Sequence, residues 1–195
     1  MQKLSLLVAL ILTGCATKSH LLNQADLLPY QDSSQLTKVN LEDSLLEISE
    51  IVDERDDLII GHAYTGVEYL KTPVYFKKEM SQFMMDYLIS SFEARNLEVV
   101  KESSKKLRVL IKKFKVYEVL EKFHLEKAKC EVEIGFELAV GGNVWSGNYR
   151  TDYLSGGNLD DGSDKLAPTV ASCMNDLMES LVNDEKFIKT LAAKE

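Results

Sequence analysis

The strongest constraint on the fold is an alternation of apolar and mostly charged residues that runs from residue 128 to residue 140. Successive side chains of a β-strand point to opposite faces, so this alternation predicts one long strand with a buried face and a face in water. Gly141-Gly142-Asn143 follow directly and predict a hairpin turn into a second strand over residues 144–154. The chain should therefore build a sheet that is covered on one face only.

Other parts of the chain also have the pattern of strands. Residues 36–41 and 45–52 are short and rich in Leu, Ile and Val, and they lead into the charged residues 53–57, which we interpret as a solvated loop. Residues 107–116 alternate as well, but the alternation slips at Lys112-Lys113. One extra residue at that point predicts a β-bulge.

Two segments have the spacing of amphipathic helices. Apolar residues recur at intervals of three and four over residues 78–95 and again over residues 164–183, where Pro168 must lie in the first turn. Asn96 tolerates the left-handed conformation that ends a helix, and residues 184–191 predict a short terminal helix. The two apolar stripes are Met80, Phe83, Met84, Tyr87, Leu88 and Phe92, and Leu166, Val170, Cys173, Leu177 and Leu181.

Together these patterns predict an α+β fold. We expect a two-layer sandwich in which a mostly antiparallel or mixed sheet of about five strands carries two long helices on one face, with a short C-terminal helix. The opposite face would be a solvated surface with weak ion pairs, and a docked protein partner is the alternative. This charged face consists of Glu131, Glu133 and Glu137 on the long strand and of Arg108 and Lys112 on its neighbour.

The N-terminus has the features of a secretory signal. Lys3 precedes a nine-residue apolar run over residues 4–12, far short of the about 20 residues that a membrane-spanning helix needs. Leu12-Thr13-Gly14-Cys15 resembles the bacterial lipobox, in which cleavage between Gly14 and Cys15 leaves a diacylated cysteine as the first residue. A plain cleaved signal with a coincidental cysteine is the alternative.

These features divide the chain into three parts. Residues 1–14 would be the lipoprotein signal peptide, residues 15–35 a lipid-anchored flexible tether, and residues 36–195 a single α+β periplasmic domain. The formal net charge of the whole chain is −8. Such a surface repels a phosphate backbone, so we expect no nucleic acid partner.

Cys130 and Cys173 remain if Cys15 carries lipid. The alternation places Cys130 on a strand and the helical spacing places Cys173 on a helix, both pointing into the core. A helix packed on a sheet lies about 10 Å away, whereas a disulfide needs Cα atoms within about 7 Å. We therefore favour two buried thiols, with a disulfide as the alternative.

No pattern of catalytic or metal-binding residues stands out. His20 falls in the tether, His62 in a loop after Gly61, and His124 between charged strands. Residues 160–164 superficially resemble a calcium loop but lack its alternating oxygen ligands and closing Glu, so we interpret them as a turn. We therefore expect no catalytic residues, no metal, no cofactor and no enzymatic activity.

Several short segments resemble the YajG family of bacterial envelope lipoproteins. They are residues 148–153 (Asn-Tyr-Arg-Thr-Asp-Tyr), 171–178, 183–188, 52–55 and 60–61. The resemblance implies an envelope lipoprotein, and it brings no catalytic residues with it. The fold also resembles the auxiliary lipoproteins of ABC-type lipid-transport systems, although a shared fold is weak support for a shared role. Ala16, in place of Asp, resembles the signal for export to the outer membrane.

These observations lead to two alternative functions. The first is a non-enzymatic lipoprotein that is anchored to the outer membrane of a Gram-negative bacterium, faces the periplasm and acts through contacts with an envelope protein. The second is an accessory lipoprotein subunit of an ABC-type lipid-transport system. This second function predicts a groove for a hydrophobic ligand between the helices and the sheet.

Overall fold

The computed structural model describes residues 20–22, 44–65, 70–120, 126–155 and 165–193. The predicted strand over residues 36–41 lies outside these ranges. Within them the chain forms eight strands and three helices. In chain order these are β1 (His20–Leu22), β2 (Leu45–Asp53), β3 (Gly61–Thr65), β4 (Leu70–Phe76), α1 (Met80–Glu93), β5 (Glu98–Val99), β6 (Lys106–Leu120), β7 (Glu126–Val140), β8 (Asn143–Leu154), α2 (Leu166–Val182) and α3 (Glu185–Leu191).

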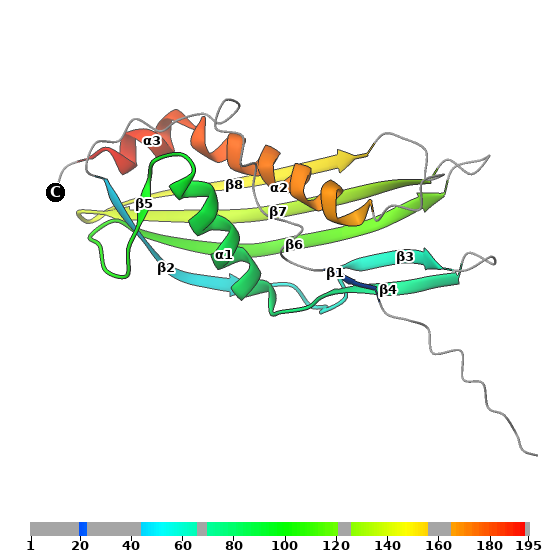
Figure 1. Cartoon of the computed structure of the whole chain (residues 1–195). Helices are drawn as coiled ribbons and strands as arrows, with labels where there is room; N and C mark the ends of the chain where they lie inside the picture. Colours follow the sequence, from blue (N-terminus) through cyan, green and yellow to red (C-terminus); the bar gives the residue numbers. More distant parts are fainter. Residues whose placement is uncertain (1–19, 23–43, 66–69, 121–125, 156–164, 194–195) are drawn as a thin grey trace, which may run out of the picture.

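The long strand β6 organises the sheet (Figure 1). One edge of β6 pairs with β7 along its whole length, and β7 pairs in turn with β8, both in antiparallel fashion. The other edge of β6 is shared. Its first part pairs with β2 and its later part with β3, in parallel, so β2 and β3 follow one another along the same edge. The hairpin partner β4 then pairs with β3, and β1 adds to β4 in parallel.

The predicted α+β class is confirmed, and the sheet is mixed. The expectation of a mostly antiparallel sheet of about five strands is wrong, because four of the seven strand pairings are parallel and eight strands take part. A parallel pair needs a long crossover, and between β2 and β6 the chain supplies the β3–β4 hairpin and α1. Alternation in a sequence predicts which side of a strand is buried, and it does not predict which strand lies beside it.

The two-layer arrangement applies to only part of the sheet. In Figure 1 the three helices lie over β2, β6, β7 and β8, whereas β1, β3 and β4 extend beyond the lower end of α1. Between the helices and the sheet, buried apolar side chains fill the space. They come from the inner faces of β6 and β7 and from both predicted helical stripes, every member of which is buried.

The local predictions for turns and helix ends are largely confirmed. The register of β6 against β7 shifts between Ile111 and Lys113, which is the predicted bulge. The β7–β8 turn contains Gly141 and Gly142 at positive φ. Asn96 has a φ of 64°, as expected for the residue that ends the first helical segment.

Two polar contacts join α1 and the turn that follows it to α2. The Tyr87 hydroxyl donates to Oδ1 of Asn175 over 2.7 Å. The side chain of Arg95, which is 1% exposed, donates to the Glu179 carboxylate over 2.6 Å and to the Ser91 carbonyl over 2.9 Å. Buried polar groups that are paired in this way restrict how the two helices can pack against each other.

The expectation of two buried thiols is wrong, because Cys130 on β7 and Cys173 on α2 form a disulfide with a Cα–Cα distance of 6.2 Å. The spacing of about 10 Å between a helix and a sheet refers to the helix axis, and a Cα on the inner side of the helix lies about 2.3 Å closer. Cysteine is also small, so the two backbones approach further at this point. The bridge ties α2 to the centre of the sheet.

Three residues of the predicted tether belong to the sheet. His20–Leu22 form β1, which pairs with β4, and the side chain of Leu22 is fully buried. Residues 15–19 and 23–35 lie outside the described residues. The part of the tether between Cys15 and the first strand is therefore only a few residues long.

Candidate functional site

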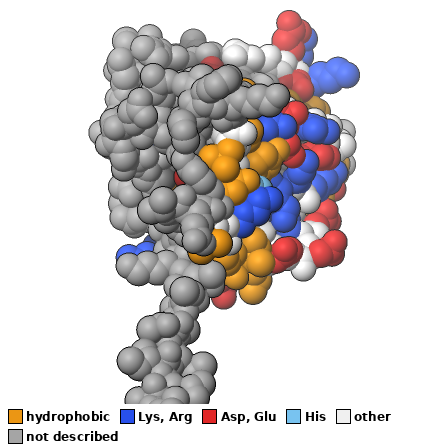
Figure 2. All heavy atoms as spheres, turned by 90° about the vertical axis from the view of Figure 1, so that its right-hand side faces the viewer, with side chains coloured by type: hydrophobic (Ala, Val, Ile, Leu, Met, Phe, Trp, Pro, Cys, Tyr) orange, Lys and Arg blue, Asp and Glu red, His pale blue; other side chains and the backbone are white. Residues whose placement is uncertain are grey.

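The face of β6, β7 and β8 opposite the helices, here called the open face, carries the charged side chains of the alternating strands. No described helix or strand covers it (Figure 1). Figure 2 views the molecule from the side where β6 ends, and basic and acidic side chains intermix there beside a strip of hydrophobic ones. The open face is therefore a polar surface with ordered charges, and it is the first candidate for contact with another molecule.

Glu131 is the centre of one group of charges on the open face. Its carboxylate accepts hydrogen bonds from Lys113, from Lys129 over 2.6 Å and from the Tyr117 hydroxyl over 2.8 Å. The lysines and the tyrosine together lower the pKa of Glu131 to about 2, with the bond from Lys113 as the largest cause. The carboxylate therefore stays charged at any physiological pH.

A second group crosses three strands. The Arg108 guanidinium on β6 lies 2.6 Å from the Glu50 carboxylate on β2 and 3.2 Å from the Glu137 carboxylate on β7. The hydrogen bonds to Glu50 and then Glu137 raise the pKa of Arg108. The expected pairing of Arg108 across the strands is thus confirmed.

The bulge in β6 brings two consecutive lysines to the open face, because Lys112 lines a depression there and Lys113 contacts Glu131. Lys112 was expected to pair with the glutamates, but the described contact to Glu131 comes from Lys113. One extra residue in a strand shifts the alternation of the side chains that follow, so Lys113 shares the face of Lys112 instead of pointing into the core. Glu133 in turn accepts a hydrogen bond from the Asn148 amide over 2.9 Å.

An aromatic cluster adjoins the Glu131 group. His62, which the sequence placed in a loop, lies on β3, where its ring stacks on Tyr117 at 5.4 Å and meets the edge of Tyr64 at 5.6 Å. Burial, followed by the charge of Lys71, lowers the pKa of His62, so the ring is neutral at pH 7. Sequence reasoning missed this cluster because Tyr117 on β6 meets His62 and Tyr64 on β3 only through the strand order.

A depression of about 360 Å³ marks the centre of the open face. Its lining includes Lys112, Gly135, Glu137 and Asn148. Gly135 lacks a side chain there, and a Cβ at this position would approach Cε of Lys112 to 3.3 Å. The depression is polar and lies between paired charges, which suits recognition of a polar surface rather than a buried ligand.

The charged residues 53–57, which we interpreted as a solvated loop, contain a buried arginine. The side chain of Arg55 is only 7% exposed, and its Nε and Nη2 each donate to the Asp53 carboxylate over 2.7 Å. Burial raises the pKa of Asp53, but the hydrogen bonds and charge of Arg55 outweigh it, so the pKa is lowered overall. The loop interpretation is confirmed for the acidic residues of this run, which are exposed, and the side chain of Arg55 is the exception.

The described residues offer little for metal binding or catalysis. Among them, no three or more His, Cys, Asp or Glu side chains come together as a metal site. The side chain of His20 and all of His124 lie outside the described residues, as do residues 160–164, Gly14 and Cys15. In the part of the chain that the structure describes, none of the helices has both the length and the apolar character to cross a membrane.

Comparison with known proteins identifies a family and several similar structures. A family model described as "Uncharacterized lipoprotein" matches residues 41–192. No curated protein matches. Among solved structures, protein XCC0632 from Xanthomonas campestris, of family DUF330, has a TM-score of 0.52 and 13% identity, over 84% of this chain and 92% of that one. This likeness extends to the fold alone.

Two further structures are more distant. One, titled as an uncharacterized protein, has a TM-score of 0.48 at 11% identity, over 86% of this chain and 99% of that chain. The other is a minor lipoprotein from Acinetobacter baumannii, with a TM-score of 0.31 at 9% identity, over 76% of this chain and 90% of that chain.

Proposed function

Because the chain belongs to the family of uncharacterized lipoproteins whose model spans residues 41–192, we propose that it is a non-enzymatic lipoprotein of the Gram-negative envelope. In this proposal acyl chains on Cys15 hold it at the outer membrane, and the body faces the periplasm. The lipobox-like residues 12–15 carry the proposal. The finer resemblance to the YajG lipoproteins, which rests on residues 148–153 and 171–178, is part of it.

The position of β1 limits how far the body can move from the membrane. Cys15 precedes His20 by five residues, and an extended chain spans at most about 3.6 Å per residue, or about 18 Å in total. An acylated Cys15 would thus hold β1 and its neighbour β4 close to the lipid surface. The open face would stand in the periplasm beside the membrane.

The open face supports a role in protein contacts. Its charges are already held in place by hydrogen bonds, so a partner with complementary charges would meet a rigid surface. Ordered charges of this kind favour specificity and rate of association. The depression over Gly135 adds shape to the same surface.

The alternative, an accessory subunit of an ABC-type lipid-transport system, requires a hydrophobic groove between the helices and the sheet. In the described residues this space is filled by buried side chains such as Leu88, Val109 and Leu177. The filled layer favours the protein-contact role. Lipid that co-purifies with the Cys15→Ser chain in the absence of detergent would instead support the transport role.

The anchor is tested by cell fractionation. Cys15→Ser should move the protein from the membrane to the soluble periplasmic fraction, while Ser19→Ala, which leaves residues 12–15 intact, should stay in the outer membrane. A Cys15→Ser protein that remains in salt-washed membranes would contradict the anchor.

The contact role is tested by photo-crosslinking in cells. A crosslinker placed at Ser146 or Lys112 on the open face should capture the same envelope protein, whereas a crosslinker at Lys189, on the exposed side of α3, should not. Equal capture from all three positions, or capture from Lys189 alone, would remove the open face from the proposal.

A further inference from the structure

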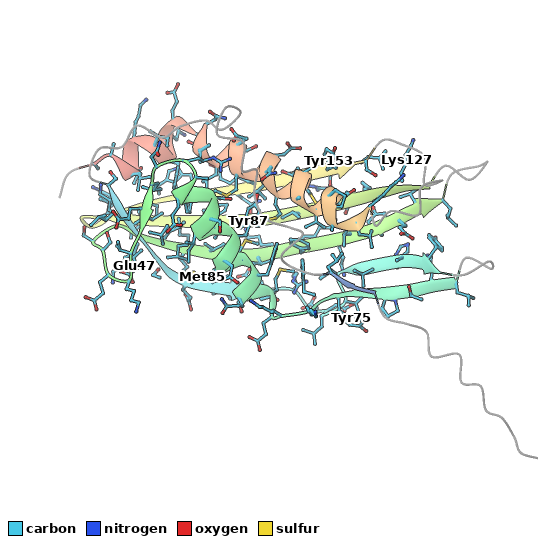
Figure 3. The ribbon with its side chains drawn as sticks, in the orientation of Figure 1. Glu47, Tyr75, Met85, Tyr87, Lys127 and Tyr153 are labelled. Atoms are coloured by element: carbon cyan, nitrogen blue, oxygen red, sulfur yellow. A yellow bond between two sulfur atoms is a disulfide. The ribbon has the colours of Figure 1, made fainter. Side chains whose placement is uncertain are left out.

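A cavity of about 600 Å³ lies where the ends of β2 and β4 meet the N-terminus of α1, away from the open face. Its lining contains three cationic side chains, Arg55, Lys77 and Lys78. Tyr75 also lines it and lies on the part of β4 that leads into the lower end of α1 (Figure 3). The protein-contact role of the open face does not use this cavity.

Arg55 gives the cavity a buried cation with an unused donor. Nε and Nη2 form the edge of the guanidinium that binds Asp53, so Nη1 points away from that carboxylate. Nη1 is buried and has no hydrogen-bond partner. Leaving such a donor unpaired in a buried position is unfavourable, and an oxyanion in the cavity would supply the missing acceptor.

The N-terminus of α1 supplies further donors. The first backbone hydrogen bond of the helix joins the Phe83 amide to the Glu79 carbonyl, which leaves the amides of Met80 and Ser81 without an intrahelical partner. No side chain caps this end, and its first turn has no acidic residue. Met80 and Ser81 both line the cavity. An uncapped helix N-terminus attracts anions through its free amides and its dipole.

The rest of the lining defines what kind of anion would fit. Asp53 and Glu79 are the carboxylates of the cavity, and Asp53 is already neutralised by Arg55. Lys78 also pairs with Asp86 at 3.6 Å. The apolar side chains are Leu58, Ile60, Tyr75, Phe76 and Met80, and Leu58 is 80% exposed at the rim.

We propose that this cavity binds a phosphate group that carries an apolar part, with the phosphate between Arg55 and the N-terminus of α1 and the apolar part against Phe76 and Leu58. A phosphate presents more negative charge and more acceptor oxygens than a carboxylate to the Arg55 side chain, the lysines and the free amides of α1, which favours phosphate. The cavity is too large for a free phosphate ion alone. This inference does not depend on acylation of Cys15.

The test uses the full chain with Cys15→Ser, which keeps every described residue and needs no detergent to dissolve the protein. Octyl phosphate, inorganic phosphate and octyl glucoside are titrated against it by calorimetry. Octyl phosphate should bind at least ten-fold more tightly than inorganic phosphate, because only it fills the apolar part. Octyl glucoside, which has the same alkyl chain and no anion, should bind at least ten-fold more weakly than octyl phosphate.

Variants separate binding from folding. Arg55→Gln should weaken octyl phosphate binding at least ten-fold, whereas Arg150→Gln, which removes an exposed arginine on β8, should leave it unchanged. Ser81→Asp places a negative charge in the first turn of α1. That charge suits the helix dipole, so the melting temperature should stay equal or rise while the affinity falls at least ten-fold.

The opposite results would overturn the proposal. They are no binding of octyl phosphate, equal affinity for octyl phosphate and either control ligand, or an unchanged affinity in a folded Ser81→Asp chain. Because Ser81→Asp is expected to fold at least as well as the parent, it decides the question even if Arg55→Gln does not fold. The binding experiments use the Cys15→Ser chain, so their expected results stay the same even if the fractionation experiment contradicts the membrane anchor.

Discussion

Reduction of the disulfide between Cys130 and Cys173 should lower the stability of the protein by about 4 kcal/mol. The bridge closes a loop with a sequence separation of 43 residues. The loss of chain entropy in the unfolded state for a loop of that length amounts to about 13 cal/mol/K, which is about 4 kcal/mol at 25 °C. Both cysteines are fully buried, so the reduced thiols would keep most of their packing and the change should come mainly from the unfolded chain.

The assay is urea unfolding of the Cys15→Ser chain with and without reductant, followed by circular dichroism. With a dependence on urea of about 2 kcal/mol/M, a loss of 4 kcal/mol shifts the midpoint down by about 2 M. The double variant Cys130→Ala/Cys173→Ala should unfold near the reduced midpoint and should not respond to reductant. Two reactive thiols in unfolded, unreduced protein, or equal midpoints when labelling shows full reduction, would refute the reasoning.

Three further substitutions test the core, a close backbone approach and a charge. Leu177→Ala should lower the free energy of unfolding by about 2 to 5 kcal/mol because Leu177 is fully buried, whereas Leu58→Ala at an exposed position should change it little; equal effects in urea would contradict the core assignment. Gly61→Ala should lower the free energy of unfolding by at least about 2 kcal/mol, because its Cβ would lie 1.5 Å from the Val116 carbonyl oxygen. An unchanged melting temperature would refute this close approach. Glu131 has a folded pKa of about 2, below its ordinary value of 4.5, so its contribution is complete above pH 4.5 and is lost as the pH falls toward 2. Glu131→Gln should therefore be about 1 to 3 kcal/mol less stable than the parent at pH 7 and equal to it near pH 2, and a constant difference across that range would argue against the ion pairs.

Periodicity predicted the elements whose side chains face one core. The alternation over residues 128–140 and the two helical stripes each report the burial of single positions, and burial repeats with the geometry of the element. These positions are buried as expected. The slip at Lys112-Lys113 was visible for the same reason, because a bulge interrupts the repeat.

The features that the sequence did not reveal depend on pairs of distant residues. The alternation in residues 45–52 predicts the same buried side chains whichever strand lies beside them. It could therefore not show that β2 and β3 share one edge of β6. Arg55 lies in a run of charges that is normally solvated, and neither its pairing with Asp53 nor the burial of its side chain can be read from that run. His62 likewise meets Tyr117 only through the strand order.

The shared edge of β6 has a consequence for how the molecule opens. β2 pairs with β6 from Glu47 to Asp53, whereas in the described residues the backbone register of β3 against β6 comprises Gly61 and His62. β4 pairs with β3, and β1 pairs with β4. In the described residues, the backbone pairing that joins the β1–β3–β4 unit to β6 is therefore short. A unit with so short a pairing detaches locally, and its amide protons exchange while the rest of the protein stays folded. A pulling force on the N-terminal residues would act first on β1, so the β1–β3–β4 unit would detach before the rest of the protein unfolds.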